Sequence, residues 1–426
     1  MKKNEIAVFW FRRDLRLQDN TALYEALNSG FEVLPLFIFD EEILNELPEN
    51  DARVNFIYDT LYDIQTEVKK YNSSLLIKKG NALHAWQQIL NEFNVKELYF
   101  NKDYEPYARK RDQIISELCA KNGVEVYSFK DQVIFEESEI VKIDGNPYTV
   151  YTPYKNKWLE TYNEIKCESV TSEKLVHKLL KISFEFPSLQ RLGFSKSSIK
   201  VKSINYSCVS CYEKTRDIPF IETSNISVFL RFGLLSIRKL VVDFFEMNST
   251  FISELIWREF FMQILFHFPE VVHKNFKPKY NNVQWRNNEE EFKLWCEGKT
   301  GYPIVDAGMR QLNETGYMHN RVRMITASFL CKHLLIDWRW GEAYFAEKLL
   351  DYELASNSGN WQWVAGTGCD AAPYFRVFNP ITQQQKFDPN FEYIKKWIPN
   401  FDFQANKAIV EHKFARERFL KAFVTS

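Results

Sequence analysis

The sequence is poor in the residues that interrupt regular structure. Glycine and proline each occur only 14 times in 426 residues, which excludes collagen-like, low-complexity and linker-dominated chains. The seven cysteines are odd in number and widely spaced, so they do not form the disulfide framework of a small secreted domain. Cys208 and Cys211 lie close together, but no second pair follows at zinc-site spacing, and we interpret both as ordinary thiols.

An excess of one charge and long apolar runs are also missing. Lys and Arg number 55 against 56 Asp and Glu, for a net charge of −1. This balance excludes a uniformly basic nucleic-acid binder but leaves room for a local basic groove. The apolar start Ile6–Phe11 is too short for a secretion signal, and no run approaches the roughly 18 residues of a membrane helix. We therefore expect a cytoplasmic protein that does not contact a membrane.

Aromatic residues are abundant by contrast. The chain has 11 Trp, 21 Tyr and 36 Phe, or 16% of all residues. Eight of the tryptophans lie beyond residue 250. Because each buried indole N–H needs a hydrogen-bond partner, such a concentration suits a planar aromatic ligand or electron transfer as well as a core.

The first 130 residues alternate short apolar runs with helical patterns. The apolar runs, rich in β-branched and aromatic residues, are expected as strands at Ile6–Phe11, Val33–Phe39, Leu75–Lys78, Glu97–Asn101 and Val124–Phe129. Helices are expected between them, two of which have Asn50 and Asn81 as N-caps. This alternation predicts a Rossmann-like, doubly wound parallel sheet. The phosphate-binding G-x-G-x-x-G pattern is absent from it.

The remaining residues divide into a connection and a helical region. Residues 131–205 lack the alternation, and we interpret them as an inter-domain linker with a few short helices. From 206 to 426 the pattern is helical, with one helix expected over Thr250–Phe268, capped by Ser249, and another from Pro303 to near Gly316. The sequence thus predicts an α/β domain at 1–130, a linker at 131–205 and an all-α domain at 206–426.

Motifs for hydrolysis, metal binding and phosphate loops are absent. The seven histidines are dispersed, and neither H-E-x-x-H nor G-x-S-x-G occurs. Gly298-Lys299-Thr300 lacks the earlier glycine that a P-loop requires. We therefore expect no metal.

Polar residues on aromatic helices are the remaining candidates for a site. Glu254, Trp257 and Arg258 are spaced to share one helix face, and Asn320, Arg323 and Met324 repeat that spacing. Further polar or indole side chains follow at Arg321, Asp351, Asn357, Trp361, Trp363, Arg376 and Gln383. Polar groups on apolar segments are costly to bury without partners, so together they favour a functional site.

The chain resembles the DNA photolyase and cryptochrome family over nearly its whole length. The resemblance begins with FWFRRDLRLQDN, continues through GNPYTVYTPY and TSNISVFLRFG, and is strongest in SELIWREFF, EGKTGYPIVDAGMRQLNETGYMHNRVRMITASFL and NSGNWQWVAGTGCDAAPYFRVFNP. Within the family, the sequence most resembles the class I cyclobutane pyrimidine dimer photolyases. The family implies FAD in the helical domain, active as FADH⁻, an α/β domain able to hold an antenna chromophore, and no metal.

The resemblance also implies roles for individual residues. The implied FAD contacts are Tyr212, Thr223, Ser224, Asn225, Ile226, Ser227, Arg323, Asp351, Tyr352, Glu353 and Asn357. Asn357 matches the position facing flavin N5, where photolyases have Asn and plant cryptochromes have Asp. Trp361, Trp338 and Trp285 match the chain of indoles that passes electrons to oxidised flavin.

The implied partner is DNA that contains pyrimidine dimers. The residues expected to contact the flipped dimer or the surrounding DNA are Arg216, Glu254, Trp257, Arg258, Asn320, Arg321, Met324, Trp363, Arg376 and Gln383. Glu254, Asn320 and Asn357 are the catalytic candidates. In the implied reaction an electron passes from excited FADH⁻ to the dimer, the cyclobutane ring splits and the electron returns. Glu254 either donates to a pyrimidine carbonyl, which requires a raised pKa, or accepts from a pyrimidine N–H.

Two other functions within the family remain open. A six-four photolyase is expected to have a pair of pocket histidines near Asn320, where the sequence has only His319. A cryptochrome photoreceptor usually has a long C-terminal tail, and this sequence ends about 45 residues after Gln383. We therefore expect the protein to repair cyclobutane pyrimidine dimers. We also expect it to be a monomer.

The antenna chromophore is the least defined expectation. Relatives that bind methenyltetrahydrofolate have Glu and Lys where this sequence has Ala108 and Val272. This makes folate doubtful and leaves a deazaflavin, a second flavin or no antenna.

Overall fold

The computed structural model describes residues 4–165, 167–400 and 407–424 and divides the chain into two compact units. The α/β unit consists of residues 1–139, 159–201 and 226–243, and the helical unit of residues 140–158, 202–225 and 244–426. Neither unit is continuous in sequence. The expected linker at 131–205 is shared between them, and residues 226–243 belong to the α/β unit.

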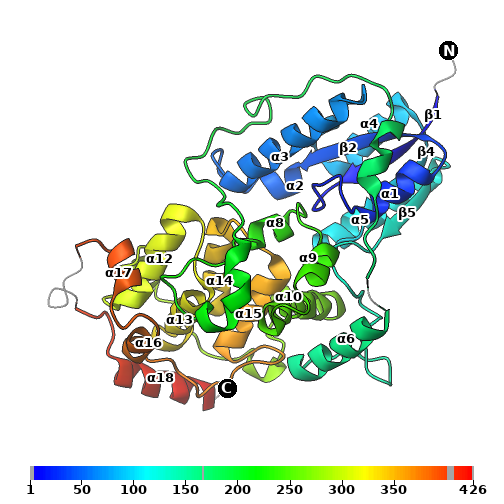
Figure 1. Cartoon of the computed structure of the whole chain (residues 1–426). Helices are drawn as coiled ribbons and strands as arrows, with labels where there is room; N and C mark the ends of the chain where they lie inside the picture. Colours follow the sequence, from blue (N-terminus) through cyan, green and yellow to red (C-terminus); the bar gives the residue numbers. More distant parts are fainter. Residues whose placement is uncertain (1–3, 166, 401–406, 425–426) are drawn as a thin grey trace. The chain divides into compact units, whose positions relative to one another are not determined.

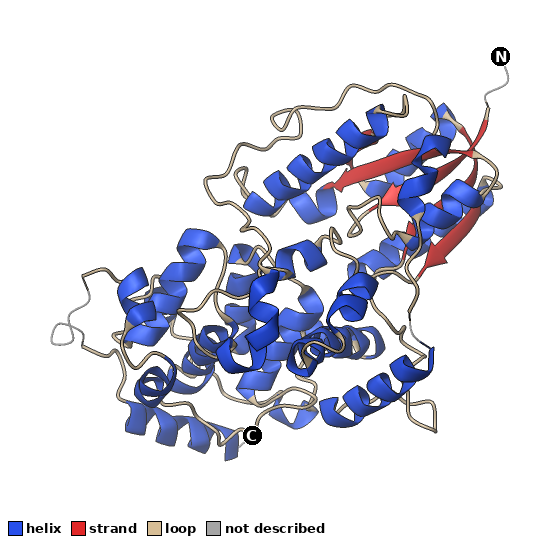
Figure 2. Cartoon of the chain, in the orientation of Figure 1, coloured by secondary structure: helices blue, strands red, loops and turns tan. Residues whose placement is uncertain are grey.

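A five-stranded parallel sheet forms the centre of the described α/β unit (Figure 2). Its strands are β1 (Glu5–Phe11), β2 (Glu32–Asp40), β3 (Leu76–Gly80), β4 (Asn94–Asn101) and β5 (Glu125–Phe129), in the order β3-β2-β1-β4-β5. The helices of this unit are α1 (Thr21–Asn28), α2 (Glu41–Leu44), α3 (Ala52–Lys69), α4 (Ala82–Glu92), α5 (Pro106–Lys121), η1 (Ser172–Lys178), α8 (Ser227–Arg231) and α9 (Ile237–Phe244) (Figure 1). Val8 of β1 pairs with Leu34 of β2 on one side and with Leu98 of β4 on the other, so β2 and β3 extend the sheet on one side of β1 and β4 and β5 on the other. The predicted doubly wound sheet is confirmed.

The helical unit contains no strand among its described residues. Its helices are η2 (Tyr206–Cys211), α7 (Tyr212–Thr215), α10 (Ser249–His267), η3 (Pro269–Val272), η4 (Pro278–Tyr280), α11 (Glu289–Cys296), α12 (Pro303–Thr315), α13 (Asn320–Ser328), η5 (Phe329–His333), α14 (Trp338–Lys348), α15 (Leu354–Ala365), α16 (Pro380–Phe387), α17 (Glu392–Trp397) and α18 (His412–Val424). The turn η5 is a π-helix continuous with α13. The all-α expectation for this part of the chain is therefore confirmed.

Several helix boundaries differ from those expected. Asp51 rather than Asn50 caps α3, and Asn248 rather than Ser249 caps α10, because these side chains accept the free N–H groups of the first turn. Asn81 caps α4 as expected. The expected linker holds a full helix, α6 (Tyr151–Ile165).

Buried ion pairs hold distant parts of the α/β unit together. Arg16 donates to both carboxylate oxygens of Asp131 at 2.8 and 2.7 Å. Arg238 donates to Asp131 at 2.9 Å and to Asp19 at 3.0 Å. Burial by itself would raise the pKa of Asp131, but Arg16 and Arg238 lower it overall. We call these four residues the buried charge network.

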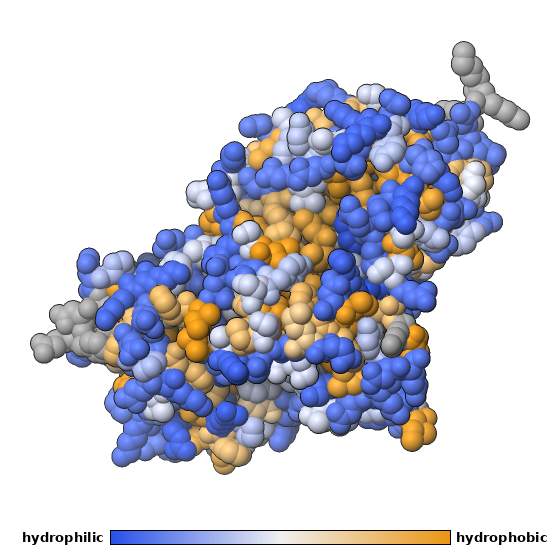
Figure 3. Space-filling view, viewed as in Figure 1, coloured by the Kyte–Doolittle hydropathy of each residue, from blue (hydrophilic) through white to orange (hydrophobic). Residues whose placement is uncertain are grey.

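The apolar residues are largely internal. Hydrophilic side chains cover most of the face in Figure 3, with separate apolar areas between them. In the helical unit a large core contains the buried rings of Trp295, Phe329, Trp338 and Trp361. No helix in the described ranges is long and apolar enough to cross a membrane. The same ranges hold no group of His, Cys, Asp and Glu arranged to bind a metal ion.

Candidate functional site

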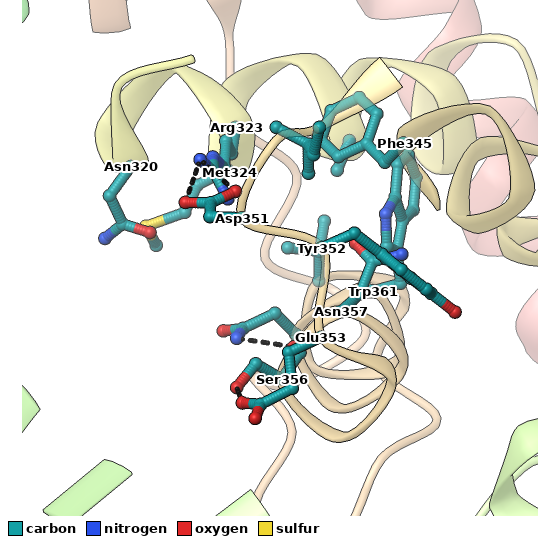
Figure 4. Close-up of a pocket in the computed structure, with 14 residues that line it drawn as sticks. Asn320, Arg323, Met324, Phe345, Asp351, Tyr352, Glu353, Ser356, Asn357 and Trp361 are labelled. Atoms are coloured by element: carbon teal, nitrogen blue, oxygen red, sulfur yellow. Dashed lines mark hydrogen bonds and ion pairs between the residues drawn. The ribbon is translucent and has the colours of Figure 1, made fainter. Parts of the chain in front are cut away.

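The candidate site is a pocket formed by α13, α14, α15 and the segment that joins the last two helices (Figure 4). It contains about 560 Å³ of empty space, part of it open to solvent. Eight of the expected site residues line it: Asn320, Arg323, Met324, Asp351, Tyr352, Glu353, Asn357 and Trp361. The other lining residues are Ala327, Phe345, Leu349, Ser356, Asn360 and Val364.

An ion pair occupies one side of the pocket. Arg323 donates from Nη2 to both carboxylate oxygens of Asp351, at 3.1 and 2.9 Å. Its Nε donates to the carbonyl of Met318 at 2.8 Å, which fixes the direction of the guanidinium. In Figure 4 this pair lies beside Asn320 and Met324. The pair is therefore rigid and already assembled at the pocket wall.

Asn357 is held by a residue that the sequence did not indicate. Its Nδ2 donates to both the carbonyl oxygen and the carboxylate Oε1 of Glu342, at 3.0 and 2.9 Å. Burial raises the pKa of Glu342, although hydrogen bonds from Asn357 and Tyr352 oppose the rise. Because both amide hydrogens are engaged, the Asn357 oxygen has a defined orientation.

Aromatic rings form another wall of the pocket. Trp361 packs edge-on against Phe345, with ring centroids 4.9 Å apart, and against Trp295 at 6.2 Å. A Cβ atom on Gly341 would lie 2.1 Å from the Trp361 ring, so glycine is required at this approach. Trp295 was not among the expected electron carriers, although it lies next to Trp361.

The other two expected electron carriers lie in or against the same core as Trp361. Trp338 is fully buried, and its indole N–H donates to Asn275 at 2.8 Å. Trp285 is half-buried and packs edge-on against Phe423 of α18. Trp361 and Trp338 are thus both buried, and Trp285 is the one of the three indoles that is partly exposed.

Glu254 lies on α10 and forms an ion pair with another expected site residue. Arg216 Nη1 donates to Glu254 Oε1 at 2.5 Å, and the guanidinium lies 5.7 Å from the centre of the Tyr212 ring. Burial raises the pKa of the Glu254 carboxyl, and Arg216 only partly offsets the rise. A carboxyl in this setting retains its proton to a higher pH than an exposed one.

Trp257, one turn after Glu254, stacks on a tyrosine. The rings of Tyr151 and Trp257 are 3.6 Å apart and inclined by only 9°. The Tyr151 hydroxyl donates to the Ser253 carbonyl at 2.7 Å, and the backbone N–H of Tyr151 donates to the Asp370 carboxylate at 3.0 Å. Tyr151 therefore fixes the plane of the Trp257 indole. The motif GNPYTVYTPY included Tyr151, but its pattern did not indicate this contact.

The remaining expected DNA contacts are not among the described residues that line the pocket. Arg258 approaches the pocket residue Glu353 at 3.7 Å, and Arg321 forms a 2.7 Å ion pair with Asp217. Trp363 packs against the large core. The Arg376 side chain is exposed and Gln383 is half-buried.

The run Thr223–Ser227 lies where the chain passes from one unit to the other. Thr223, Ser224 and Asn225 belong to the helical unit, and Ile226 and Ser227 to the α/β unit. Asn225 has a positive φ of 56°, and its side chain donates to the Ser203 carbonyl at 3.1 Å. The run is not among the described residues that line the pocket.

The pocket has the chemical character that a flavin ring requires. Phe345, Trp361, Leu349 and Val364 supply apolar surface, while Arg323 supplies a fixed cationic group. A planar ring system with an apolar end and a polar edge needs both kinds of wall. The residues present therefore fit FAD.

Comparison with known proteins agrees with this fit. Residues 7–173 match the family model for DNA photolyase, and residues 251–424 match that for the FAD binding domain of DNA photolyase. A deoxyribodipyrimidine photo-lyase of Vibrio cholerae is 37% identical over 92% of this chain and 89% of its own.

Two solved structures extend the comparison. A class III photolyase from Agrobacterium tumefaciens has a TM-score of 0.87 and 33% identity, covering 100% of this chain and 98% of its own. An archaeal photolyase from Sulfolobus tokodaii, solved with two FAD molecules, has a TM-score of 0.81 and 32% identity, covering 99% and 100%. The helical unit therefore contains an FAD-binding domain, and the chain belongs to the DNA photolyase family of enzymes.

Proposed function

We propose that this protein repairs cyclobutane pyrimidine dimers in DNA by light-driven electron transfer. One observation carries the proposal: a single pocket, in a chain that belongs to the photolyase family, combines Arg323, Asp351 and Asn357 with the aromatic Trp361. The chemistry supplied by bound, reduced FAD is the transient donation of one electron to the dimer. The names of the curated relatives, such as that from Vibrio cholerae, support the same substrate class.

The cofactor is held from several directions in this proposal. The pair of Arg323 and Asp351 would hold the flavin ring, and Asn357, oriented by Glu342, would present its oxygen to the flavin N5. Tyr352 and Glu353 line the same cavity. The contacts to the phosphate side are Tyr212, Thr223, Ser224, Asn225, Ile226 and Ser227.

The dimer is held by residues of α10, α13 and α15. Trp257 and Trp363 stack on the flipped bases, which contributes about 1–3 kcal/mol per base in other proteins. Glu254 hydrogen-bonds a pyrimidine as charge develops on it. Asn320 and Met324 complete the pocket, and Arg216, Arg258, Arg321, Arg376 and Gln383 contact the surrounding DNA.

The pocket favours the cyclobutane dimer over the six-four photoproduct. No histidine is among the described residues that line it. The nearby His319 instead caps α13, because its Nδ1 accepts the N–H of Arg321 at 3.2 Å. Burial lowers the pKa of His319 to about 4, so the ring is neutral at pH 7 and cannot act as a general acid there.

The α/β unit is the proposed antenna domain. Ala108, on α5, is buried at 4% exposure and offers no carboxylate to a folate. The second FAD of the Sulfolobus tokodaii photolyase suggests a flavin as one candidate antenna. Purified protein is therefore expected to lack stoichiometric folate, which absorbance and mass spectrometry of an acid extract would measure.

Illuminated repair of DNA that carries each lesion separately tests the proposal. The reduced protein should repair cyclobutane dimers and leave six-four photoproducts intact. If it repairs only six-four photoproducts, the lesion assignment is wrong. If it repairs neither lesion while its flavin still photoreduces, the protein is a photoreceptor of cryptochrome type.

Two variants separate the proposed electron routes. Trp361→Phe should abolish photoreduction by an external reductant but leave repair nearly intact once dithionite has reduced the flavin. Glu254→Ala should keep photoreduction and lower the repair yield per absorbed photon. If the chemically reduced, flavin-loaded Trp361→Phe variant fails to repair bound substrate, the assignment of the indole chain is wrong.

A further inference from the structure

A buried lysine is the least expected charged group of the helical unit. Lys332 lies in the π-helix η5 and is 1% exposed. Its ammonium donates to the carbonyl of Arg376 at 2.9 Å and to that of Tyr374 at 3.3 Å. It also lies 5.5 Å from the centre of the Phe419 ring of α18. Among the described residues no carboxylate acts on its charge; the ionisable groups that do are Cys331 and Arg376.

The segment that Lys332 contacts is irregular and partly exposed. Residues 373–379, between α15 and α16, have no helix or strand. We call this segment the 373–379 loop. Its own backbone bonds are short-range: Arg376 N–H to the Pro373 carbonyl and Val377 N–H to the Phe375 carbonyl. The side chains of Phe375 and Arg376 are exposed, and Phe375 is 59% exposed.

Several internal contacts anchor this loop. The Tyr374 ring stacks on Phe423 of α18, with centroids 6.0 Å apart and planes inclined by 11°, and Val377 packs against the same cluster. A further contact is the pair of bonds from Lys332 to the backbone. Burying an ammonium without a carboxylate is costly, and its charge-assisted bonds to two carbonyls are what offset that cost. The Lys332 ammonium thus stabilises the backbone of the loop and has no part in catalysis.

We propose that Lys332 is a positioning residue that fixes the 373–379 loop so that Arg376 reaches a DNA phosphate. The inference rests on the proposed function, because it takes Arg376 to be a DNA contact. Lys332 itself does not touch DNA or flavin. Its two bonds hold the carbonyls on both sides of Phe375, and this sets where the exposed Phe375 and Arg376 side chains point.

The protonation of Lys332 should make the affinity for DNA depend on pH. Burial lowers the pKa of Lys332 to about 8, so its charge is lost as the pH rises through that value. A neutral amine forms hydrogen bonds roughly half as strong as those of an ammonium. DNA affinity should therefore weaken between pH 7 and 9.

The surrounding groups do not change charge over the same interval. Burial raises the pKa of the Cys331 thiol and lowers that of Arg418, but guanidinium groups keep their charge in this pH range. Burial lowers the pKa of His333 to about 3 and lowers that of His412 as well, so both rings are already neutral at pH 7.

The affinity test is a double-mutant cycle on Lys332→Met and Arg376→Ala, with the flavin-loaded protein and duplex DNA that carries one cyclobutane dimer. One phosphate contact contributes a salt slope of about 0.9, or about an eightfold change in affinity at 0.1 M salt. Each single variant should lose about that factor, and the double variant should lose no more than either one. Additive losses would overturn the proposal.

The matched control is Lys279→Met. Lys279 also lies over an aromatic ring, at 4.7 Å from the centre of Tyr280, but it is exposed. The Lys279→Met variant loses the same charge without releasing the loop, so the affinity of this variant for DNA should fall by much less than eightfold. The flavin spectrum should be unchanged in all variants. The parent and Lys279→Met should lose affinity between pH 7 and 9, whereas Lys332→Met should not.

Limited digestion with trypsin tests the anchor independently of DNA. Trypsin cleaves after Arg376, and Lys332 binds the carbonyl of that bond. Lys332→Met should be cut between Arg376 and Val377 at least tenfold faster than the parent or Lys279→Met, as mass spectrometry of the fragments would show. If cleavage rates are equal, the positioning role is wrong. If cleavage accelerates but Arg376→Ala binds DNA normally, the anchor is correct and the proposed DNA contact fails.

Discussion

The two units use buried charge in different ways. In the α/β unit, the buried charge network joins two arginines and two aspartates, each less than 10% exposed at its side chain. In the helical unit, the pairs Arg323–Asp351 and Arg216–Glu254 each leave one or both partners about a quarter to a third exposed. The carboxylates of the first set are paired with buried arginines, whereas the second set retains contact with solvent and with a cavity.

This difference separates structural from functional charge. Asp131 accepts bonds from Arg16, Arg238 and Thr21, which leaves it no capacity for a ligand. Asp351, by contrast, has one arginine partner and borders an open pocket. Removing a charge should therefore affect folding in the first unit and ligand or substrate chemistry in the second.

The largest effect is expected for Asp131→Ala. Removing it leaves Arg16 and Arg238 buried without their main partner, which typically costs about 3–5 kcal/mol. Urea unfolding of the flavin-loaded protein would measure the loss. Because the folded-state pKa of Asp131 is lowered, its contribution is present above the unfolded pKa of about 3.9 and is lost as the pH falls. A loss below about 1 kcal/mol would show that the network is not structural.

A smaller effect, on the cofactor, is expected for Arg323→Ala. Loss of a hydrogen-bonded cation beside the flavin should weaken FAD binding by about 2 kcal/mol, or roughly thirtyfold. Equilibrium titration of flavin-free protein with FAD, followed by flavin fluorescence, would measure it. Equal FAD affinity in the variant and the parent would remove Arg323 from the cofactor site.

An effect of about fivefold is expected at Glu254, where the repair yield should depend on pH. If its raised pKa keeps the carboxyl protonated to donate to the dimer, the repair yield of the parent should fall as the pH rises through that pKa. Glu254→Gln, which donates at every pH, should stay constant, and Glu254→Ala should stay about fivefold lower, as expected for roughly 1 kcal/mol from one hydrogen bond. A parent yield that does not change with pH would favour the carboxylate as an acceptor.

The smallest effect is expected for an exposed ion pair in the α/β unit. Arg191 and Glu185 are 2.8 Å apart, but their side chains are 65% and 78% exposed. Solvent screens such pairs, so Arg191→Ala should change the free energy of unfolding by less than about 0.5 kcal/mol. A change as large as that of Asp131→Ala would mean that burial does not explain the contrast.

The sequence predicted the strands and the four helices to which it gave bounds or caps, because their signals are local. Alternating apolar runs marked the parallel sheet, and Asn81 and Gly316 marked real helix ends. The helix α6 was missed because Pro153 lies in its first turn. Proline usually indicates a loop. In the first turn of a helix, however, the backbone N–H groups have no acceptor within the helix, so a proline there costs no hydrogen bond.

The partners of the site residues were harder to predict because they depend on tertiary contacts. Glu342 lies on a helix whose pattern contains no sign of a site, and only the packing of α14 on α15 brings it to Asn357. Tyr151 and Trp257 are likewise 106 positions apart in the chain and meet only in the fold. Resemblance named the side chains of the pocket, but the residues that orient them needed coordinates.

The discontinuity of the α/β unit has a consequence for how the protein is synthesised. Asp131 leaves the ribosome 107 residues before its partner Arg238. At roughly 5–20 residues per second, this interval lasts about 5–20 seconds. During that time Asp131 lacks one of its two arginine partners and the Asp19 carboxylate lacks its arginine partner, so the sheet forms before the ion pairs that complete its unit. Translation speed across residues 131–238 thus sets how long the nascent α/β unit stays incomplete.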